Sequence, residues 1–345
     1  MKRPLALAVL AITAAAVSQN TAPELTVVSY GSGAYQESHK HAFIEPFEKE
    51  TGSKVTSLSW GAEYGHLQEM VRSRHVPWDV VEVTAAQYAR GEHEGLFAPL
   101  SSPVPAATYE PIPNSPAPTR FGVPNVYWST VLAYRGDTFR DRPPQSWRDF
   151  WDVQHFPGPR GLYDGPRGTL EFALLADGTP RDHLYPLDVN RAFKKLDEIR
   201  PAVRLWWQDG TEPVNALLTG RVVLTNAWSG RIFASPQARK ELRYTWAGAA
   251  HELDYWVIPK GAINVPLATR FIHFASGPSA MAVQAMATAY GPANKLALGH
   301  VAKDILQQLP TAPENWQVSF VVDSAWWSQH EQEVQERWAV WRSQR

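Results

Sequence analysis

The chain has 345 residues, about twice the usual domain length of roughly 100–200 residues, which predicts two domains. Its 33 Lys and Arg residues nearly balance its 34 Asp and Glu residues, which argues against a nucleic-acid binder with a basic face, and a hydrophobic content of 44% excludes global disorder. The absence of cysteine excludes disulfides, thiolate zinc sites, iron–sulfur clusters and cysteine nucleophiles.

The N-terminus has the pattern of a secretory signal. Lys2 and Arg3 precede an apolar run over residues 5–16, which is too short for a membrane span of about 20 residues. Small polar residues follow the run. We therefore expect residues 1–18 to be a signal peptide and the rest of the chain to be exported, to the periplasm.

Strands and helices alternate through the first part of the chain. Residues 24–30 (ELTVVSY) form an apolar run, and a helix that carries Phe43 and Phe47 inward stops at Gly52. This alternation predicts βαβ units and a mostly parallel sheet. The other elements expected here are strand 55–60, helix 67–74 and strand 79–83.

The alternation of strands and helices is interrupted in the middle of the chain. Seven prolines within residues 99–118 predict a long surface loop. An extended aromatic segment over 121–134 follows, and we expect the chain to cross to the second domain just after Ser129. The later elements expected are strands 221–225 and 255–258, a helix in 280–289, and a closing amphipathic helix with Val334, Trp338 and Trp341 on its inner face.

Motifs of catalysis are scarce. Gly31, Ser32 and Gly33 lack the third glycine of a dinucleotide fingerprint, and the sequence has no Walker A loop, nucleophile elbow or HExxH motif. His39 and His41 are two residues apart and would point in different directions on a helix, so we expect no metal site. We expect neither an enzyme nor a cofactor.

Nine short motifs follow one another along most of the chain. They are VVSYGSGAYQ (27–36), FEKETG (47–52), WDVVEV (78–83), GLFAPL (95–100), GVPNVYWST (122–130), GPRGTLEFALLADG (165–178), NAWSG (226–230), LDYWVIP (253–259) and AYGPAN (289–294). In this order they resemble the spermidine/putrescine-binding family, the periplasmic solute receptors of ABC transporters.

The resemblance implies an α/β fold with two lobes, that of a type II periplasmic binding protein, and a ligand cleft between the lobes. The N-terminal lobe would comprise residues 24–129 plus 255–300, and the C-terminal lobe residues 130–254 plus 301–345. The cleft would lie at the carboxyl ends of strands. The protein would act as a monomer that delivers its solute to the membrane permease of an ABC transporter.

The resemblance also implies ligand-binding residues. Trp228, in the family's WxG motif, would form a flat wall for an alkyl chain or a cation, and Asp254 would pair with a ligand amine. Core packing for Trp228 and a helix cap for Asp254 are the alternative roles. The other candidates are Tyr290, the first-turn residues Tyr30, Ser32 and Tyr35, and Tyr127 and Trp128 at the crossing, of which alternation does not say which one faces the cleft.

Two departures from the family concern the ligand. Glu252 stands where polyamine binders have a wall aromatic, and Arg167 is the only charged side chain of the GPRGT segment, where they have acids. Arginine repels a polycation and clamps a carboxylate. Arg167 in the cleft would therefore indicate a ligand with an acid group, whereas an ion pair at the surface or between the lobes is the other interpretation.

The main functional hypothesis is an extracytoplasmic receptor of an ABC importer that closes on a small amine, a polyamine such as spermidine or putrescine. The alternative on the same fold is a zwitterion such as an ω-amino acid or an opine-like compound. A ferric-ion receptor, which typically uses adjacent tyrosines that this chain lacks, and a secreted enzyme are the more remote alternatives.

Overall fold

The computed structural model describes residues 22–31, 33–113 and 115–344. The expected signal peptide and the candidate residue Ser32 lie outside the described residues. Within them, no helix combines the length and the apolar character that a membrane crossing requires.

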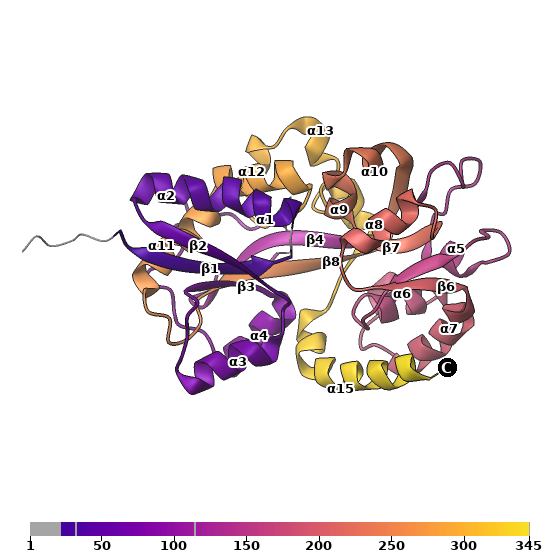
Figure 1. The fold of residues 1–345 in the computed structure, drawn as a ribbon, viewed down its shortest axis with the longest axis horizontal. Coiled ribbons are helices and arrows are strands. Elements are labelled where there is room, and N and C mark those ends of the chain that lie inside the picture. The colour runs from indigo at the N-terminus through magenta and orange to yellow at the C-terminus, as the bar shows by residue number, and fades with distance from the viewer. Residues whose placement is uncertain (1–21, 32, 114, 345) are drawn as a thin grey trace, which may run out of the picture.

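The described strands form one mixed sheet with helices on both faces (Figure 1). Their bounds are β1 Glu24–Tyr30, β2 Lys54–Trp60, β3 Val80–Thr84, β4 Gly122–Arg135, β5 Arg160–Tyr163, β6 Val203–Trp207, β7 Leu224–Trp228, β8 Leu242–Val257, β9 Gly291–Pro292 and β10 Phe320–Val321. The order is β2-β1-β3-β8-β4-β7-β5-β6. β1 pairs in parallel with β2 and β3, β5 pairs in parallel with β6 and β7, and the antiparallel pair β4–β8 joins these two groups.

Helices cover both faces of each parallel group. In the first lobe they are α1 Ala34–His39, the π-helical turn η1 Lys40–Ile44, α2 Glu45–Thr51, α3 Tyr64–Ser73, α4 Ala85–His93, α11 Val265–Ala275, α12 Pro278–Thr288, η4 Lys295–His300 and α13 Lys303–Leu306. In the second lobe and its tail they are α5 Trp147–Trp151, α6 Thr169–Ala176, η2 Arg181–His183, α7 Val189–Ile199, η3 Arg200–Ala202, α8 Thr211–Leu218, α9 Ser229–Ala234, α10 Pro236–Glu241, α14 Pro313–Val318 and α15 Ser324–Ser343. This is the expected two-lobed α/β fold (Figure 1).

The two long strands β4 and β8 pass from one lobe to the other (Figure 1). Their pairing shifts register between Pro124 and Tyr127 and again between Thr130 and Leu132. Such irregularities bend and twist a strand pair locally, and here they lie where β4 and β8 pass between the lobes. The expected crossing near Ser129 lies within this segment.

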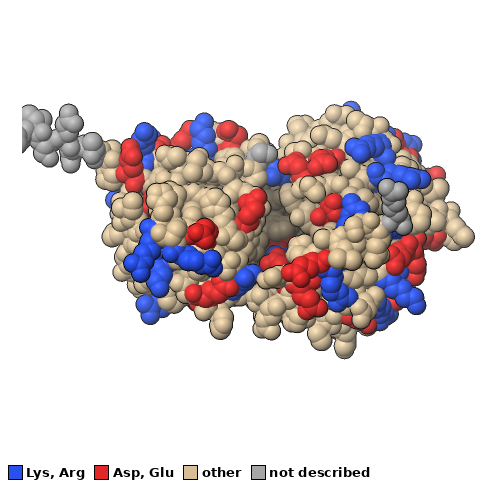
Figure 2. Space-filling model, turned by 60° about the horizontal axis from the view of Figure 1, so that its bottom comes forward, with Lys and Arg blue, Asp and Glu red and all other residues tan. Residues whose placement is uncertain are grey.

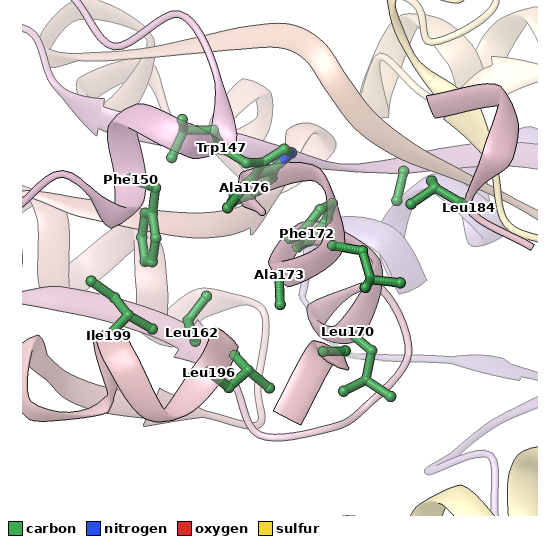
Figure 3. Close-up of a cluster of buried hydrophobic side chains, with 14 of the residues drawn as sticks. Trp147, Phe150, Leu162, Leu170, Phe172, Ala173, Ala176, Leu184, Leu196 and Ile199 are labelled. Carbon is green, nitrogen blue, oxygen red and sulfur yellow. The ribbon is translucent and has the colours of Figure 1, made fainter. Parts of the chain in front are cut away.

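Two hydrophobic clusters each lie mainly in one lobe. In the second lobe, Trp147 stacks on Phe172 of α6 with ring centroids 3.8 Å apart, within the cluster that Figure 3 shows. In the first lobe, Phe47 packs edge-on against Phe271 of α11 at 5.2 Å. Val301 and Leu309 also belong to this first-lobe cluster. We therefore propose that the first lobe extends beyond the expected boundary at residue 300, to Leu309.

Two expected strands differ from the observed ones. The strand expected over 221–225 is β7, three residues further along, because the N–H of Val222 bonds to the carbonyl of Ala216 and closes the turn after α8. The strand expected over 255–258 is the end of β8, whose earlier part is rich in small and polar residues and lacks a clear apolar pattern. The buried face of α15, with Val334, Trp338 and Trp341, is as predicted.

Candidate functional site

Aromatic side chains end the parallel strands of both lobes, where the lobes face each other. Tyr30 and Trp60 end β1 and β2 and stack with their centroids 5.8 Å apart. Across from them, Tyr163, Trp207 and Trp228 end β5, β6 and β7. Figure 2 shows a hollow between the lobes with acidic side chains along its lower edge. Ligands of open α/β sheets bind outside the carboxyl ends of the strands, so this cleft is the candidate site.

Two buried carboxylates lie on the first-lobe side of the cleft. Glu82 of β3 is fully buried, and its Oε1 accepts bonds from the Tyr35 hydroxyl at 2.8 Å and from the Asn125 amide at 2.7 Å. Asp254 of β8 is 2% exposed. Glu82 Oε2 and Asp254 Oδ1 have no hydrogen-bond partner among the residues that the structure describes. Burial without such partners is costly for a carboxylate unless a cation comes to it.

The protonation of these carboxylates reflects their burial. Burial raises the pKa of Glu82 to about 7, although the Tyr35 and Asn125 hydrogen bonds oppose the shift. Burial, followed by the negative charge of Glu82, raises the pKa of Asp254 well above its ordinary value, against a hydrogen bond from Trp128. His39, whose Nε2 lies 4.0 Å from Glu82 Oε2, does not supply the missing cation, because burial lowers its pKa to about 3.

An aromatic wall continues from the crossing strand into the second lobe. Trp128 of β4 and Trp228 meet edge to face with centroids 5.8 Å apart, and Trp207 backs Trp228 at 5.4 Å. A Cβ on Gly210 would collide with the Trp228 ring, so glycine is what lets the indole lie flat there. Such a wall offers a π-face to an alkyl chain or an ammonium group.

The predicted tyrosines differ in position. Tyr35 meets Tyr290 edge to face at 5.8 Å beside Glu82, and the ring of Tyr290 also closes on Gly230 at the start of α9. Tyr30 donates a hydrogen bond to Gln87 at 3.0 Å. Tyr127, by contrast, packs against Trp316 at 5.3 Å within the first-lobe core. Of the two crossing aromatics, Trp128 therefore lies with the other candidates and Tyr127 does not.

Arg231 of α9 brings a cation to the opposite side of the cleft. Its guanidinium lies 5.9 Å from the Trp228 ring centroid, and its Nη2 would be 2.7 Å from a Cβ on Gly31. Gly31, with a φ of +71°, directly follows β1 of the first lobe, so Arg231 reaches across between the lobes. Burial raises the pKa of Tyr290 to about 12, with Arg231 lowering it and Asp254 raising it, because this ring feels both charges.

Arg167 is held by carboxylates of its own chain. Its guanidinium pairs with Glu252 of β8 at 3.3 Å and with Glu331 of α15, and it also donates to the Thr84 hydroxyl at 3.5 Å. The side chain is 14% exposed. Burial alone would lower the pKa of Arg167, but Glu331 and Glu252 reverse this and raise it. The structure thus shows the ion pair that the sequence left as the second interpretation.

Glu82 and Arg231 were not among the sequence candidates. The signal for Glu82 was an acidic residue inside the apolar strand segment WDVVEV, where an unpaired charge is costly. Arg231 follows the WSG motif directly, and a cation three residues after a wall tryptophan was the corresponding signal. The described residues contain no group of three or more His, Asp or Glu side chains arranged to hold a metal ion.

Comparison with known proteins gives matches over nearly the whole chain. The family model for bacterial extracellular solute-binding proteins matches residues 42–313. The gamma-aminobutyric acid-binding protein of Pseudomonas aeruginosa is 39% identical over 333 residues, which are 95% of this chain and 93% of that protein. Spermidine/putrescine-binding periplasmic protein 1 of Haemophilus influenzae is 24% identical over 272 residues, 76% of this chain and 75% of that one.

Solved structures agree in fold and differ in conformation. A GABA receptor superposes with a TM-score of 0.84 at 33% identity, covering 93% of this chain and 98% of that one. The PBP MotA of Agrobacterium tumefaciens B6, in complex with glucopine, gives 0.82 at 29% identity (92% and 99% covered). The PBP AttC of A. tumefaciens C58, open and unliganded, gives 0.68 at the same identity (93% and 99% covered). MotA and AttC are equally identical to this chain in sequence, but its structure is more similar to that of liganded MotA than to that of open, unliganded AttC.

Proposed function

The chain belongs to the bacterial extracellular solute-binding protein family, and from this premise we propose that it binds a small zwitterion, an ω-amino acid such as GABA, between its lobes. The observation that carries the proposal is the pair of buried carboxylates Glu82 and Asp254. Each has an oxygen without a hydrogen-bond partner among the described residues, both lie on one face of the β3–β8 pair at the carboxyl end of β3, and the Arg231 guanidinium approaches Gly31 just after β1.

The two ends of the cleft have groups of opposite character, carboxyl groups at one end and a guanidinium at the other. At the acidic end, the ammonium group of the ligand would pair with Asp254, with Glu82 behind it, through charge-assisted hydrogen bonds. At the other end, the planar fork of Arg231 suits a carboxylate. Tyr290 packs against Gly230, the residue before Arg231, and against Tyr35, and its pKa responds to both Arg231 and Asp254. The methylene chain of an ω-amino acid would lie against the Trp128–Trp228 wall.

A polyamine, the main hypothesis from sequence, is supported less well than the zwitterion. The relative named for GABA is 39% identical to this chain and the one named for spermidine and putrescine is 24% identical. Glu252 and Glu331, which would otherwise attract a further ligand amine, are already paired with Arg167. Arg231 would also repel the far end of a polycation.

The same proposal includes the transport role. The receptor would act outside the cytoplasmic membrane, in the periplasm, as a monomer, close its lobes on the solute and deliver it to the membrane permease of an ABC importer, without chemical change to the solute. Closure is supported by the greater similarity to the glucopine complex than to the open unliganded protein. The irregular pairing of β4 with β8 provides a bending segment.

Isothermal titration calorimetry with a charge-matched ligand set tests the proposal. GABA has both charges, butylamine lacks the carboxylate, butyrate lacks the amine and putrescine replaces the carboxylate with a second amine. We expect GABA to bind most tightly and each of the others to bind at least about tenfold more weakly, because each lacks one of the two charged contacts that GABA would make. Tighter binding of putrescine than of GABA would overturn the zwitterion in favour of a polyamine.

A further inference from the structure

A second cluster of acidic side chains adjoins Glu82 and Asp254, the carboxylates proposed to bind the ligand amine. In this chain, that second cluster is paired with the protein's own cation, Arg167. Glu252 and Asp254 are two residues apart on β8, so their side chains point to the same face of the sheet. At about 3.3 Å per residue, the two positions are roughly 6.6 Å apart along the strand. That separation is comparable to the length of a short diamine, whose two ammonium groups could reach both carboxylates at once.

The charges around Arg167 are predominantly negative. Its guanidinium contacts Glu252 and Glu331, whose side chains are 10% and 25% exposed, and it is also close enough to the fully buried Glu171 to feel that charge. Burial raises the pKa of Glu252 to about 7, and Arg167 is the group that counters this shift. Without Arg167, Glu252 and Glu331 would lose the cation that pairs with both of them.

Arg167 also acts electrostatically on two tyrosines that end strands beside the cleft. Burial and the charges of Asp254 and Glu82 raise the pKa of Tyr30, while Arg167 acts on the same ring in the opposite sense. Tyr163, at the end of β5, similarly feels Glu252 and Arg167. Since Thr84 accepts a hydrogen bond from Arg167 and is the register partner of Asp254, the Arg167 cluster and Asp254 are neighbours at the β3–β8 pair.

We propose that Arg167 is a specificity-determining residue that occupies, as a built-in cation, the acidic subsite in which a second ligand amine would otherwise bind. Because its planar fork bridges two carboxylates and is tethered to the chain, it excludes a diffusing ammonium group from Glu252 and Glu331. The receptor thereby accepts a single amine at Asp254 and discriminates against diamines. This inference rests on the proposed function, in which Asp254 binds the ligand amine.

The test is a gain of diamine binding. In Arg167→Ala, the ratio of the Kd for putrescine to the Kd for GABA should fall about tenfold or more relative to the unmodified protein, as measured by calorimetry. The double variant Arg167→Ala/Glu252→Gln should lose that gain, because the freed carboxylate is gone. Arg191→Ala on α7 is the matched control, because it removes an exposed ion pair, with Asp177, and should leave the ratio unchanged.

Three results would overturn the inference. A folded Arg167→Ala protein with an unchanged ratio would do so, and so would a loss of GABA binding without any gain for putrescine, which would make Arg167 the ligand's carboxylate partner. If Arg167→Ala does not fold, Arg167→Gln takes its place. If neither variant folds alone, each is refolded in the presence of methylguanidinium or of putrescine. Recovery with putrescine would support the inference. Recovery with methylguanidinium alone would be the third contrary result.

Failure of the proposed function would look different. If the unmodified protein binds no ω-amino acid, the absolute Kd for putrescine replaces the ratio, and the comparison between Arg167→Ala and the double variant is still readable. If it does bind GABA and Arg167→Ala gains nothing for diamines, the proposed function stands and the role of Arg167 as an internal cation is wrong.

Discussion

Glu82 and Asp254 are diagonal neighbours on one face of the antiparallel pair β3–β8, because Thr84 is the register partner of Asp254 and Trp256 is that of Glu82. Diagonal positions on one face are close enough for side chains to interact. Two carboxylates so close and so buried oppose each other's ionisation, so the empty site favours protonated forms. An ammonium ion placed beside them reverses that preference, and the first two predictions follow from this.

Asp254→Asn should abolish binding of GABA. The substitution keeps the shape of the side chain but leaves the buried ammonium unpaired, which costs about 3–5 kcal/mol. The empty variant should be as stable as the unmodified protein or more so, since a buried carboxylate has been removed, and thermal unfolding checks this. Asp304→Asn, at an exposed position of α13, is the control. An unchanged Kd in Asp254→Asn would contradict the assigned role.

The affinity for an amine should rise with pH up to about pH 7, because the pKa of Glu82 is raised to about 7 in the empty protein. Below that pH the carboxylates must lose protons before they can pair with an ammonium group. Binding at about pH 6 should therefore release protons, which calorimetry in two buffers of different ionisation enthalpy detects. Proton uptake, or no proton exchange, would be the contrary result.

The stability of the empty protein should change in the opposite direction. The folded pKa of Glu82, about 7, is above its ordinary value of 4.5, so the folded state holds a proton that the unfolded chain releases between these values. The Glu82 contribution to stability is therefore present at low pH and is lost as the pH rises through this window. Glu82→Gln should flatten that part of the profile in urea titrations at several pH values.

Trp228→Ala should weaken binding of GABA by about tenfold or more, about 1.4 kcal/mol, because the alkyl chain loses its flat wall. The side chain is only partly buried, and its neighbours Trp128 and Trp207 remain, so we expect the empty variant to stay folded. Trp246→Ala removes another partly buried indole, one outside the Trp128–Trp228 wall, and serves as the control. Equal affinity in a folded Trp228→Ala protein would remove Trp228 from the site.

The lobes should be further apart without ligand. We expect the irregular β4–β8 pairing to be the bending segment, because it lies between two hydrophobic clusters that are each mainly in one lobe. Small-angle scattering should therefore give a smaller radius of gyration when GABA saturates the protein. The same radius with and without saturating GABA would indicate a cleft that is closed before the ligand arrives.

The sequence was most informative where a residue pattern has one structural meaning. The strand-to-helix alternation, the glycine at the end of α2 and the apolar face of α15 predicted elements that the structure contains. Side-chain direction at the cleft was not predictable in this way. Whether Tyr127 or Trp128 faces the cleft depends on a register shift between β4 and β8, and the partners of Arg167 come from β8 and α15, far along the chain.

Arg231 and Arg167 can be separated by ligands that differ in one charge. If Arg231 pairs with the ligand carboxylate, Arg231→Ala should weaken GABA by about tenfold or more and leave butylamine, which has no carboxylate, nearly unaffected. Arg231→Lys should fall between, because an ammonium keeps the charge but not the bidentate fork. Arg239→Ala, on the neighbouring helix α10, controls for the loss of a surface charge.

The two arginines then give opposite patterns in the same calorimetry. Removal of the Arg231 side chain should weaken ligands that have a carboxylate, such as GABA. Removal of the Arg167 side chain should instead allow a second ligand amine to bind beside Asp254. Equal weakening of GABA and butylamine by Arg231→Ala would mean that this guanidinium positions the lobes through its approach to Gly31 and does not read the carboxylate. The carboxylate partner would then have to be sought elsewhere in the cleft, because Arg167 is already paired with Glu252 and Glu331.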